Sequence, residues 1–391
     1  MAENAHTKGS DESEGSIGRL KRVPPSYYLA AGFLVFLALI PGVLGTTTIL
    51  LLTYSLFFVM FVISWDFVSG YTGLMSFGHT LFFAVGGYTA AILNVHYGVH
   101  PALGIIAGVI LAAVAGLLYG LPARNIEGHY LALMTLLPPL IMERLFRLFK
   151  DTTGGSTGLI GAENLIEMDS FAMTAWVNYY LAFGLFLFIF LLAWVITRSD
   201  TGTIFTAIKE SEDAVASVGI NPDKYKVYAF VMSAMMGGLA GAVFVHTPAG
   251  SASPSQLLSL VVIIDVLLAS ILGGLGTITG AVVGGMTIFW VREWLSDISW
   301  TIPVLDVSVS DINDVLFFLL LLALLMFLAQ GLVPWVQKRG QRLLERRQVG
   351  DPEVATDGGP TPDDRTDPSH PEATGDRSNK ERTADNQGET R

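Results

Sequence analysis

Long apolar runs recur along most of this 391-residue chain, and they limit what it can fold into. Each run holds about twenty apolar residues, enough for a helix to cross the roughly 30 Å hydrocarbon core of a bilayer. Backbone polar groups find no water in that core, so the segments that span it form helices or closed barrels. Hydrophobic residues make up 51% of the chain and charged residues only 15%, whereas soluble domains are roughly 25% charged. The sequence therefore predicts an all-α polytopic membrane protein.

Hydropathy predicts about ten spans, and the basic residues orient them. The spans are expected near residues 27–44, 47–68, 74–95, 101–121, 129–149, 177–197, 225–247, 257–272, 277–294 and 313–334. An even number of spans places both termini on one side of the membrane. That side also holds the basic residues of a polar loop at 198–226 and those after the last span, so the positive-inside rule predicts that both termini are cytoplasmic. The first run lacks a small-residue cleavage site and is interpreted as a retained span.

Three regions follow from this pattern: a polar N-terminus (1–25), a transmembrane domain (26–337) and a C-terminal segment (338–391). The C-terminal segment begins with basic residues and continues as an acidic tail. Residues 351–391 carry eleven acids and five bases, which supplies −6 of the formal net charge of −11. The tail is almost free of apolar residues, a composition typical of disordered, solvated chain. No chemistry is assigned to it.

The polar loop is the only sizeable basic loop inside the apolar part of the chain. Within it, Ser211 is suited to cap a helix, acids occupy the first turn after it, and Gly219 is suited to the position just past the helix end. The expected helix is only about two turns long, and an isolated helix of that length is marginally stable in water. Its apolar face is therefore expected to need a partner surface outside the chain; that face comprises Ile208, Val215 and Val218.

Glycines interrupt several of the apolar runs, and two explanations remain open. Small residues at four-residue spacing let helix backbones approach closely, so the glycines are compatible with tight bundle packing. Interrupted helices also point their N-terminal dipoles at anionic groups in several transporters, so the same residues are candidates for a translocation path or helix break. The candidates are Gly73, Ser76, Gly78, Gly273, Gly274 and Gly276, together with Asp265.

Individual polar residues in the spans have alternative interpretations. A carboxylate inside a span is costly and suggests a function, so Asp265 is either a hydrogen-bonding group within the bundle or part of the substrate path. Asp66, near a span end, is interpreted as an interfacial or capping acid. His79 is expected to bind either substrate or a neighbouring helix. Arg144 and nearby bases fall at the predicted outer end of the fifth span, so that segment is expected to be broken, re-entrant or lining a wet cavity.

Absent motifs exclude several kinds of site. The chain has no cysteine, which excludes disulfides, cysteine zinc sites and thiol catalysis. It has no phosphate-binding G-x-x-x-x-G-K-[ST] loop, no HExxH and no G-x-S-x-G elbow, so ATP hydrolysis would belong to another chain and an enzyme is poorly supported. No catalytic residue, metal or cofactor is expected, and no nucleic acid is expected as a partner.

Four blocks of sequence resemble the LivM/LivH permeases, the membrane subunits of branched-chain amino acid ABC importers. AIKESEDAVASVGIN in the polar loop is similar to the segment by which importer permeases dock on their ATPases. The others are SGYTGLMSFGHTLFFAVGGYTAAIL from Ser69, RNIEGHYLALMTL from Arg124 with Thr153–Gly158 after it, and DVLLASILGGLGTITGAVVGG from Asp265. Pro138 and Pro139 depart from the family pattern. The blocks lie in the family's order between about residues 60 and 290.

This resemblance implies an importer permease with a cytoplasmic coupling helix. The ATPase-coupling residues would be Glu212, Ala214, Ala216 and Gly219. The expected solutes are branched-chain amino acids or related small polar solutes such as urea or amides. The implied partners are ATP-binding cassette ATPase subunits, a paralogous permease subunit and an extracellular solute-binding protein, with the chain surrounded by lipid in the plasma membrane.

Two other classes of protein stay open at this stage. An ion-coupled secondary transporter would also be a glycine-broken bundle, with Asp66 and Asp265 as ion ligands. It would take up solute without an ATPase. A membrane scaffold or enzyme subunit is the third class, and its activity would not depend on Glu212 or Gly219.

Overall fold

The structure is a computed structural model that describes residues 25–126, 128–297, 301–302, 307–308, 313–327 and 331–333. The contacts divide the chain into two units, Met1–Leu343 and Leu344–Arg391. All described residues belong to the first unit. The predicted polar N-terminus, apart from Pro25, and the predicted C-terminal segment lie outside the described residues.

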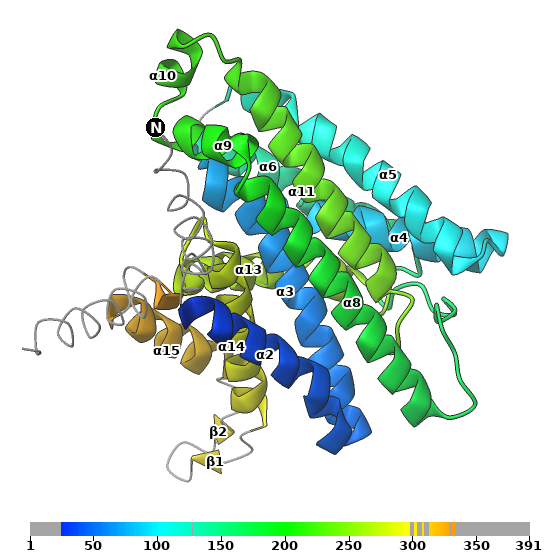
Figure 1. The fold of residues 1–391 in the computed structure, drawn as a ribbon. Coiled ribbons are helices and arrows are strands. Elements are labelled where there is room, and N and C mark those ends of the chain that lie inside the picture. Colours follow the sequence, from blue (N-terminus) through cyan, green and yellow to red (C-terminus); the bar gives the residue numbers. More distant parts are fainter. Residues whose placement is uncertain are drawn as a thin grey trace, which may run out of the picture. The chain divides into compact units, whose positions relative to one another are not determined.

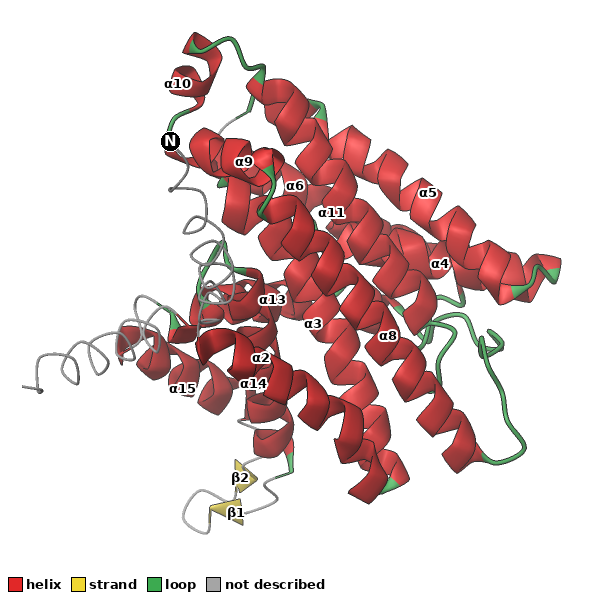
Figure 2. Cartoon of the chain, in the orientation of Figure 1, coloured by secondary structure: helices red, strands yellow, loops and turns green. Residues whose placement is uncertain are grey.

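Helices make up nearly all of the described chain (Figures 1 and 2). They are α2 (Pro25–Leu39), η1 (Ile40–Val43), α3 (Thr46–Thr72), α4 (Thr80–Tyr97), α5 (Pro101–Gly120), η2 (Pro122–Arg124), α6 (Gly128–Leu148), α7 (Lys150–Thr153), α8 (Phe171–Thr197), α9 (Asp200–Glu210), α10 (Glu212–Ser217), α11 (Pro222–Phe244), α12 (Pro254–Leu257), α13 (Leu260–Gly273), α14 (Ile278–Ser296) and α15 (Asn313–Phe327). The only strands in the described ranges are β1 (Thr301–Ile302) and β2 (Val307–Ser308), which pair antiparallel.

Each predicted span overlaps one of these helices within the residues that the structure describes, and the all-α polytopic fold class is confirmed. Among the described residues, five helical segments are long and apolar enough to cross a membrane: Thr46–Thr72, Pro101–Arg124, Phe171–Arg198, Pro222–Phe244 and Pro254–Gly273. The last of these contains the break between α12 and α13. At about 1.5 Å per residue, the 14-residue α13 alone is about 21 Å long. It is therefore shorter than the hydrocarbon core that a full span crosses.

The core forms where α11 packs against α3, α4 and α5, while α8 covers another side of α3 (Figure 1). Glycines allow the helices to approach closely. A Cβ on Gly86 of α4 would lie 2.0 Å from the carbonyl oxygen of Gly238 in α11. One on Gly241 would lie 2.1 Å from the carbonyl oxygen of Phe83. Such backbone contact is the packing that small residues permit in membrane helices.

The fifth predicted span is a single helix, so the expectation that it is broken is wrong, while the alternatives of a re-entrant segment or one lining a wet cavity stay predictions. Helix α6 continues through Pro138 and Pro139 and ends at Leu148. Each proline lacks a backbone N–H and removes one intrahelical hydrogen bond, but the helix continues past both. The charged residues sit at the exposed C-terminal end of α6, where Arg147 donates to Glu143 at 2.7 Å.

Candidate functional site

The predicted coupling segment folds as two short helices, α9 and α10, at the end of the bundle where α8 ends and α11 begins (Figure 1). Ser211 separates them, because its extended backbone (φ −163°, ψ 110°) interrupts the helix. Its Oγ accepts a hydrogen bond from the Ala214 N–H at 3.3 Å and caps α10. Gly219 follows with φ +84°, a left-handed conformation that favours glycine. Asn221 then caps α11.

The apolar face of this segment is largely covered by the chain itself. Ile208 and Val215 are buried, so the expectation that their partner surface lies outside the chain is wrong for these two residues. Phe205 of α9 is buried as well and packs edge-on against Phe67 of α3. Only Val218 is exposed, at 72%. The segment is therefore fixed to the bundle by its own side chains.

An ion pair attaches α10 to α11. Glu212 pairs with Lys226, whose side chain is fully buried, while the side chain of Glu212 is 26% exposed. A buried ammonium requires a counter-charge. Glu212 was predicted to act in ATPase coupling, and the structure places its carboxylate toward the bundle rather than outward.

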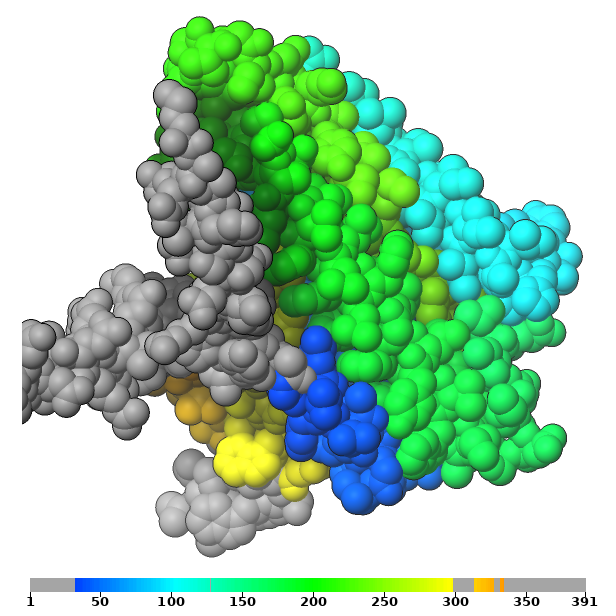
Figure 3. All heavy atoms as spheres, in the orientation of Figure 1, coloured from blue at the N-terminus to red at the C-terminus, as the bar shows by residue number. Residues whose placement is uncertain are grey.

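The other three predicted coupling residues are exposed. Ala214 and Ala216 present small side chains on α10, and Gly219 has no atom within 4 Å of where a Cβ would stand. Atoms of α10 form the upper surface in Figure 3. With Val218 beside them, they make a small, partly apolar surface without a partner in the described chain.

Lys209, near the end of α9, reaches across to the last turn of α3. Its Nζ donates to the Gly70 carbonyl oxygen at 2.8 Å. The stem of the side chain passes over Gly73, where a Cβ would lie 3.2 Å from Lys209 Cγ. Gly73 ends α3 with φ +75°. This predicted path residue therefore both terminates the helix and leaves room for the lysine.

The last two turns of α3 also contact the start of α14. Asp66 is fully buried, and its Oδ1 accepts from the Gly276 N–H at 3.0 Å. The Ile278 N–H donates to Tyr71 Oη at 3.3 Å. The first N–H groups of a helix lack intrahelical acceptors, and α3 supplies acceptors at this end of α14. Asp66 is thus a buried acid that accepts a backbone N–H just before α14, which agrees with the capping part of its interpretation as an interfacial or capping acid.

Gly276 sits in contact with Gly70. A Cβ on Gly70 would lie 2.6 Å from the Gly276 nitrogen, and one on Gly276 would lie 2.8 Å from the Gly70 oxygen. Gly276 also has φ +75°. We call this group the glycine junction and define it as Asp66, Gly70, Gly73, Lys209 and Gly276. It joins α9, the end of α3 and the break between α13 and α14.

The break itself is glycine-lined. Helix α13 ends at Gly273, and Gly274 follows with φ +118° before α14 begins at Ile278. A Cβ on Gly273 would lie 1.9 Å from the Gly280 carbonyl oxygen. The two helices therefore turn back on one another with their backbones in contact.

Ser76, Gly78 and His79 lie in the connection between α3 and α4. The Ser76 carbonyl accepts from Trp65 Nε1 at 2.7 Å, and a Cβ on Gly78 would lie 1.9 Å from the Thr135 oxygen. His79 is buried, with Nε2 3.0 Å from Ser64 Oγ of α3 and 3.1 Å from Ser233 Oγ of α11. The contact of His79 with neighbouring helices is therefore confirmed, and substrate binding by His79 stays a prediction.

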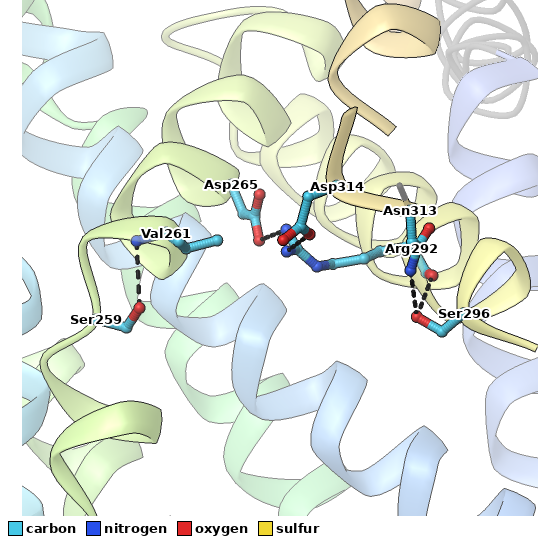
Figure 4. Close-up of polar contacts among 7 residues, drawn as sticks. All are labelled: Ser259, Val261, Asp265, Arg292, Ser296, Asn313 and Asp314. Carbon is cyan, nitrogen blue, oxygen red and sulfur yellow. Dashed lines mark hydrogen bonds and ion pairs between the residues drawn. The ribbon is translucent and has the colours of Figure 1, made fainter. Parts of the chain in front are cut away.

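Asp265 is part of a separate charged cluster that joins α13, α14 and α15 (Figure 4). Arg292 donates through Nη1 to Asp265 Oδ2 at 2.5 Å and through Nη2 to Asp314 Oδ1 at 2.7 Å. The Asp265 side chain is 9% exposed and that of Asp314 is 71% exposed. The bundle interaction considered for Asp265 is therefore present, as an ion pair rather than a neutral hydrogen bond.

The sequence did not indicate four of the charged residues that organise these contacts. They are Lys209, Lys226, Arg292 and Asp314. Lys226, Arg292 and Asp314 lie close to the end of a predicted span and Lys209 lies in the polar loop, and charged residues are ordinary in both places. The distance in sequence between each of these residues and its contact partner did not indicate that the two would meet.

Comparison with known proteins identifies a family for the chain. Residues 47–325 match the family described as "Branched-chain amino acid transport system / permease component". The permease protein LivM of a high-affinity branched-chain amino acid transport system in Escherichia coli is 28% identical over 66% of this chain and 65% of its own length. The chain thus spans a little under two thirds of that relative. No solved structure matches.

Two further relatives broaden the comparison. LivH, another permease of a branched-chain amino acid system, from Salmonella typhimurium, is 25% identical over 72% of this chain and 93% of its own length. An autoinducer 2 import system permease, LsrC of Photorhabdus laumondii, is 24% identical over 37% of this chain and 47% of its own length. Since the family match covers most of the chain and all of the elements described above from α3 to α14, this chain belongs to the branched-chain amino acid transport permease family.

Proposed function

We propose that the chain is the membrane-spanning permease subunit of an ABC importer and that it translocates branched-chain amino acids. The observation that carries this proposal is the exposed face of α10, held on the bundle by α9 and by the Glu212–Lys226 ion pair. A surface of small side chains on a tethered helix suits docking of a second protein. Movement of that protein would be transmitted through fixed contacts instead of being lost in a flexible loop.

The solute is proposed from the relatives. LivM and LivH are named for branched-chain amino acids, and LsrC is named for autoinducer 2. Family members therefore carry more than one kind of solute. Leucine is the first solute to test, with urea and acetamide as the small polar alternatives.

The proposed partners are those that an ABC importer requires. We expect two ATP-binding cassette subunits at the α9–α10 end, a paralogous permease and an extracellular solute-binding protein at the opposite end. The chain would lie in the plasma membrane with both termini cytoplasmic, because the α9–α10 end would face the ATPases. ATP hydrolysis would occur on the partner subunits.

The test begins with purification of the tagged chain from its native membranes in mild detergent. Mass spectrometry identifies the subunits that accompany it, and the assembly is reconstituted into vesicles for uptake of labelled leucine. We expect ATPase subunits to be recovered and uptake to require ATP. Recovery of the chain alone, with uptake driven by an ion gradient, would refute the proposal.

A matched pair of variants locates the docking surface. Ala216→Trp adds bulk to the exposed face of α10 and is expected to release the ATPases without unfolding the chain. Ala172→Trp makes the same change at an exposed alanine in the first turn of α8, at the far end of that helix from α9. Equal ATPase recovery with both variants would contradict docking on α10.

A further inference from the structure

Lys209 occupies a position from which movement of α9 reaches the membrane bundle directly. It lies one residue before the end of α9 and two residues before the break at Ser211. Lys209 is an exposed residue, but its ammonium group donates to the Gly70 carbonyl oxygen at 2.8 Å. That contact joins residues 139 positions apart in sequence.

The carbonyl that Lys209 contacts has no partner within its own helix. Gly70 is among the last four residues of α3, whose carbonyls are left without intrahelical donors. A lysine at a helix C-terminus both donates to such a carbonyl and complements the negative end of the helix dipole. The contact therefore adds a favourable electrostatic interaction at the end of α3.

The same carbonyl lies against the helix break. A Cβ on Gly276 would lie 2.8 Å from the Gly70 oxygen and 3.6 Å from Lys209 Nζ. The Gly276 N–H is in turn bonded to the buried carboxylate of Asp66. These contacts link the lysine, the end of α3 and the break between α13 and α14 directly, so displacement of one group is expected to displace the others.

We infer that Lys209 is a positioning residue that transmits movement of α9 to the α13–α14 break through Gly70 and Gly276. This inference rests on the proposed importer function. In it, docking and closure of the ATPases shift α9 and α10, and Lys209 carries the shift into the glycine junction. The break then changes position relative to α3, while α10 serves only as the attachment point.

The experiment uses the reconstituted assembly and three variants of this chain. Lys209→Met keeps the stem over Gly73 and removes the donor, whereas Lys209→Arg keeps a cationic donor. Lys224→Met is the matched control, because Lys224 is an exposed lysine at the same end of the bundle. For each, leucine uptake, ATP hydrolysis and the leucine concentration at half-maximal uptake are measured.

Lys209→Met is expected to lower the number of leucines transported per ATP by about tenfold, within the usual range of coupling between sites. The variant should keep the wild-type subunit composition and the wild-type rate of ATP hydrolysis. The leucine concentration at half-maximal uptake should also stay at its wild-type value. Lys209→Arg should restore most of the number of leucines transported per ATP, and Lys224→Met should leave that number unchanged.

Two results would overturn the inference while leaving the importer function in place. One is a wild-type ratio in Lys209→Met. The other is a parallel loss of uptake, ATP hydrolysis and assembled subunits, which would assign Lys209 a purely structural role. If the wild-type assembly itself shows no ATP-driven uptake, the proposed function fails and the inference fails with it.

Discussion

Replacing Glu212 by glutamine should loosen α10 more than removing its partner, Lys226. The reason is the unequal burial of the two side chains, which are 26% and 0% exposed. Glutamine keeps the size of the side chain but not its charge, so the ammonium of Lys226 remains buried without a counter-charge. In Lys226→Met, by contrast, the carboxylate of Glu212 is close enough to the surface to be hydrated.

The expected costs follow from this difference. Removing one partner of a fully buried pair costs about 3–5 kcal/mol. Because water reaches Glu212, we take a lower figure of about 2–3 kcal/mol for Glu212→Gln. That corresponds to an increase of about 30- to 150-fold in the opening of α10. For Lys226→Met we expect less than about 1 kcal/mol.

Hydrogen exchange measured by mass spectrometry on the purified chain provides the assay, because amide protection reports local opening. Peptides covering residues 212–219 should exchange faster in Glu212→Gln, and the double variant should behave like Lys226→Met, since the second change removes the unpaired charge. Glu210→Gln, at an exposed acid on the last turn of α9, is the control and should match wild type. Unchanged exchange in Glu212→Gln, or a larger effect in Lys226→Met, would refute the reasoning.

Further predictions concern the other end of the bundle and the close-packed glycines, and thermal unfolding of the chain in detergent measures all of them. Arg292→Met should destabilise the chain by about 2–4 kcal/mol, because it leaves the carboxylate of Asp265 without its cation. Asp314→Asn should cost under about 1 kcal/mol, because Asp314 is 71% exposed. Equal losses of stability in these two variants would contradict the geometry of the charged cluster. Gly284→Ala should be strongly destabilising, because its Cβ would lie 1.9 Å from the Ala269 oxygen. Gly184→Ala, with nothing within 4 Å, should stay within about 0.5 kcal/mol of wild type, and similar losses in both alanine variants would show that contact distance is not the cause.

The sequence was sufficient for the helices because their signal is local. Runs of about twenty apolar residues predict spans regardless of what lies beside them, and each predicted range holds a helix. The cap at Ser211 and the left-handed Gly219 were likewise accessible, since both depend on neighbouring residues. The fifth span was harder, because its prolines and terminal charges suggested a break that α6 does not have.

The contacts of the site depend on tertiary structure and left no local signal. Asp66 and Gly276 are separated by 210 positions. Lys209 resembles any lysine in a basic loop until α9 is packed on α3. The glycines were visible as a group, but sequence could not distinguish those that touch a facing backbone, such as Gly273, from those in open space, such as Gly184.

The two carboxylates considered as ion ligands illustrate how packing decides between mechanisms. In sequence, Asp66 and Asp265 are equivalent candidates, because each is an acid in or near an apolar span. In the structure each already has a cationic side chain in its neighbourhood: Arg292 bonds Asp265 directly, and Lys209 contacts the Gly70–Gly276 pair that Asp66 holds. A transported cation would be repelled by these resident charges, and its binding would require an ion pair or a helix anchor to open first. The same two carboxylates instead fix the ends of α14, Asp66 at its start and Asp265 near its last turn. Helix α14, which follows the break, is therefore fixed at both ends by contacts with a carboxylate. The glycine junction is then the first part of the bundle that a movement of α9 would displace.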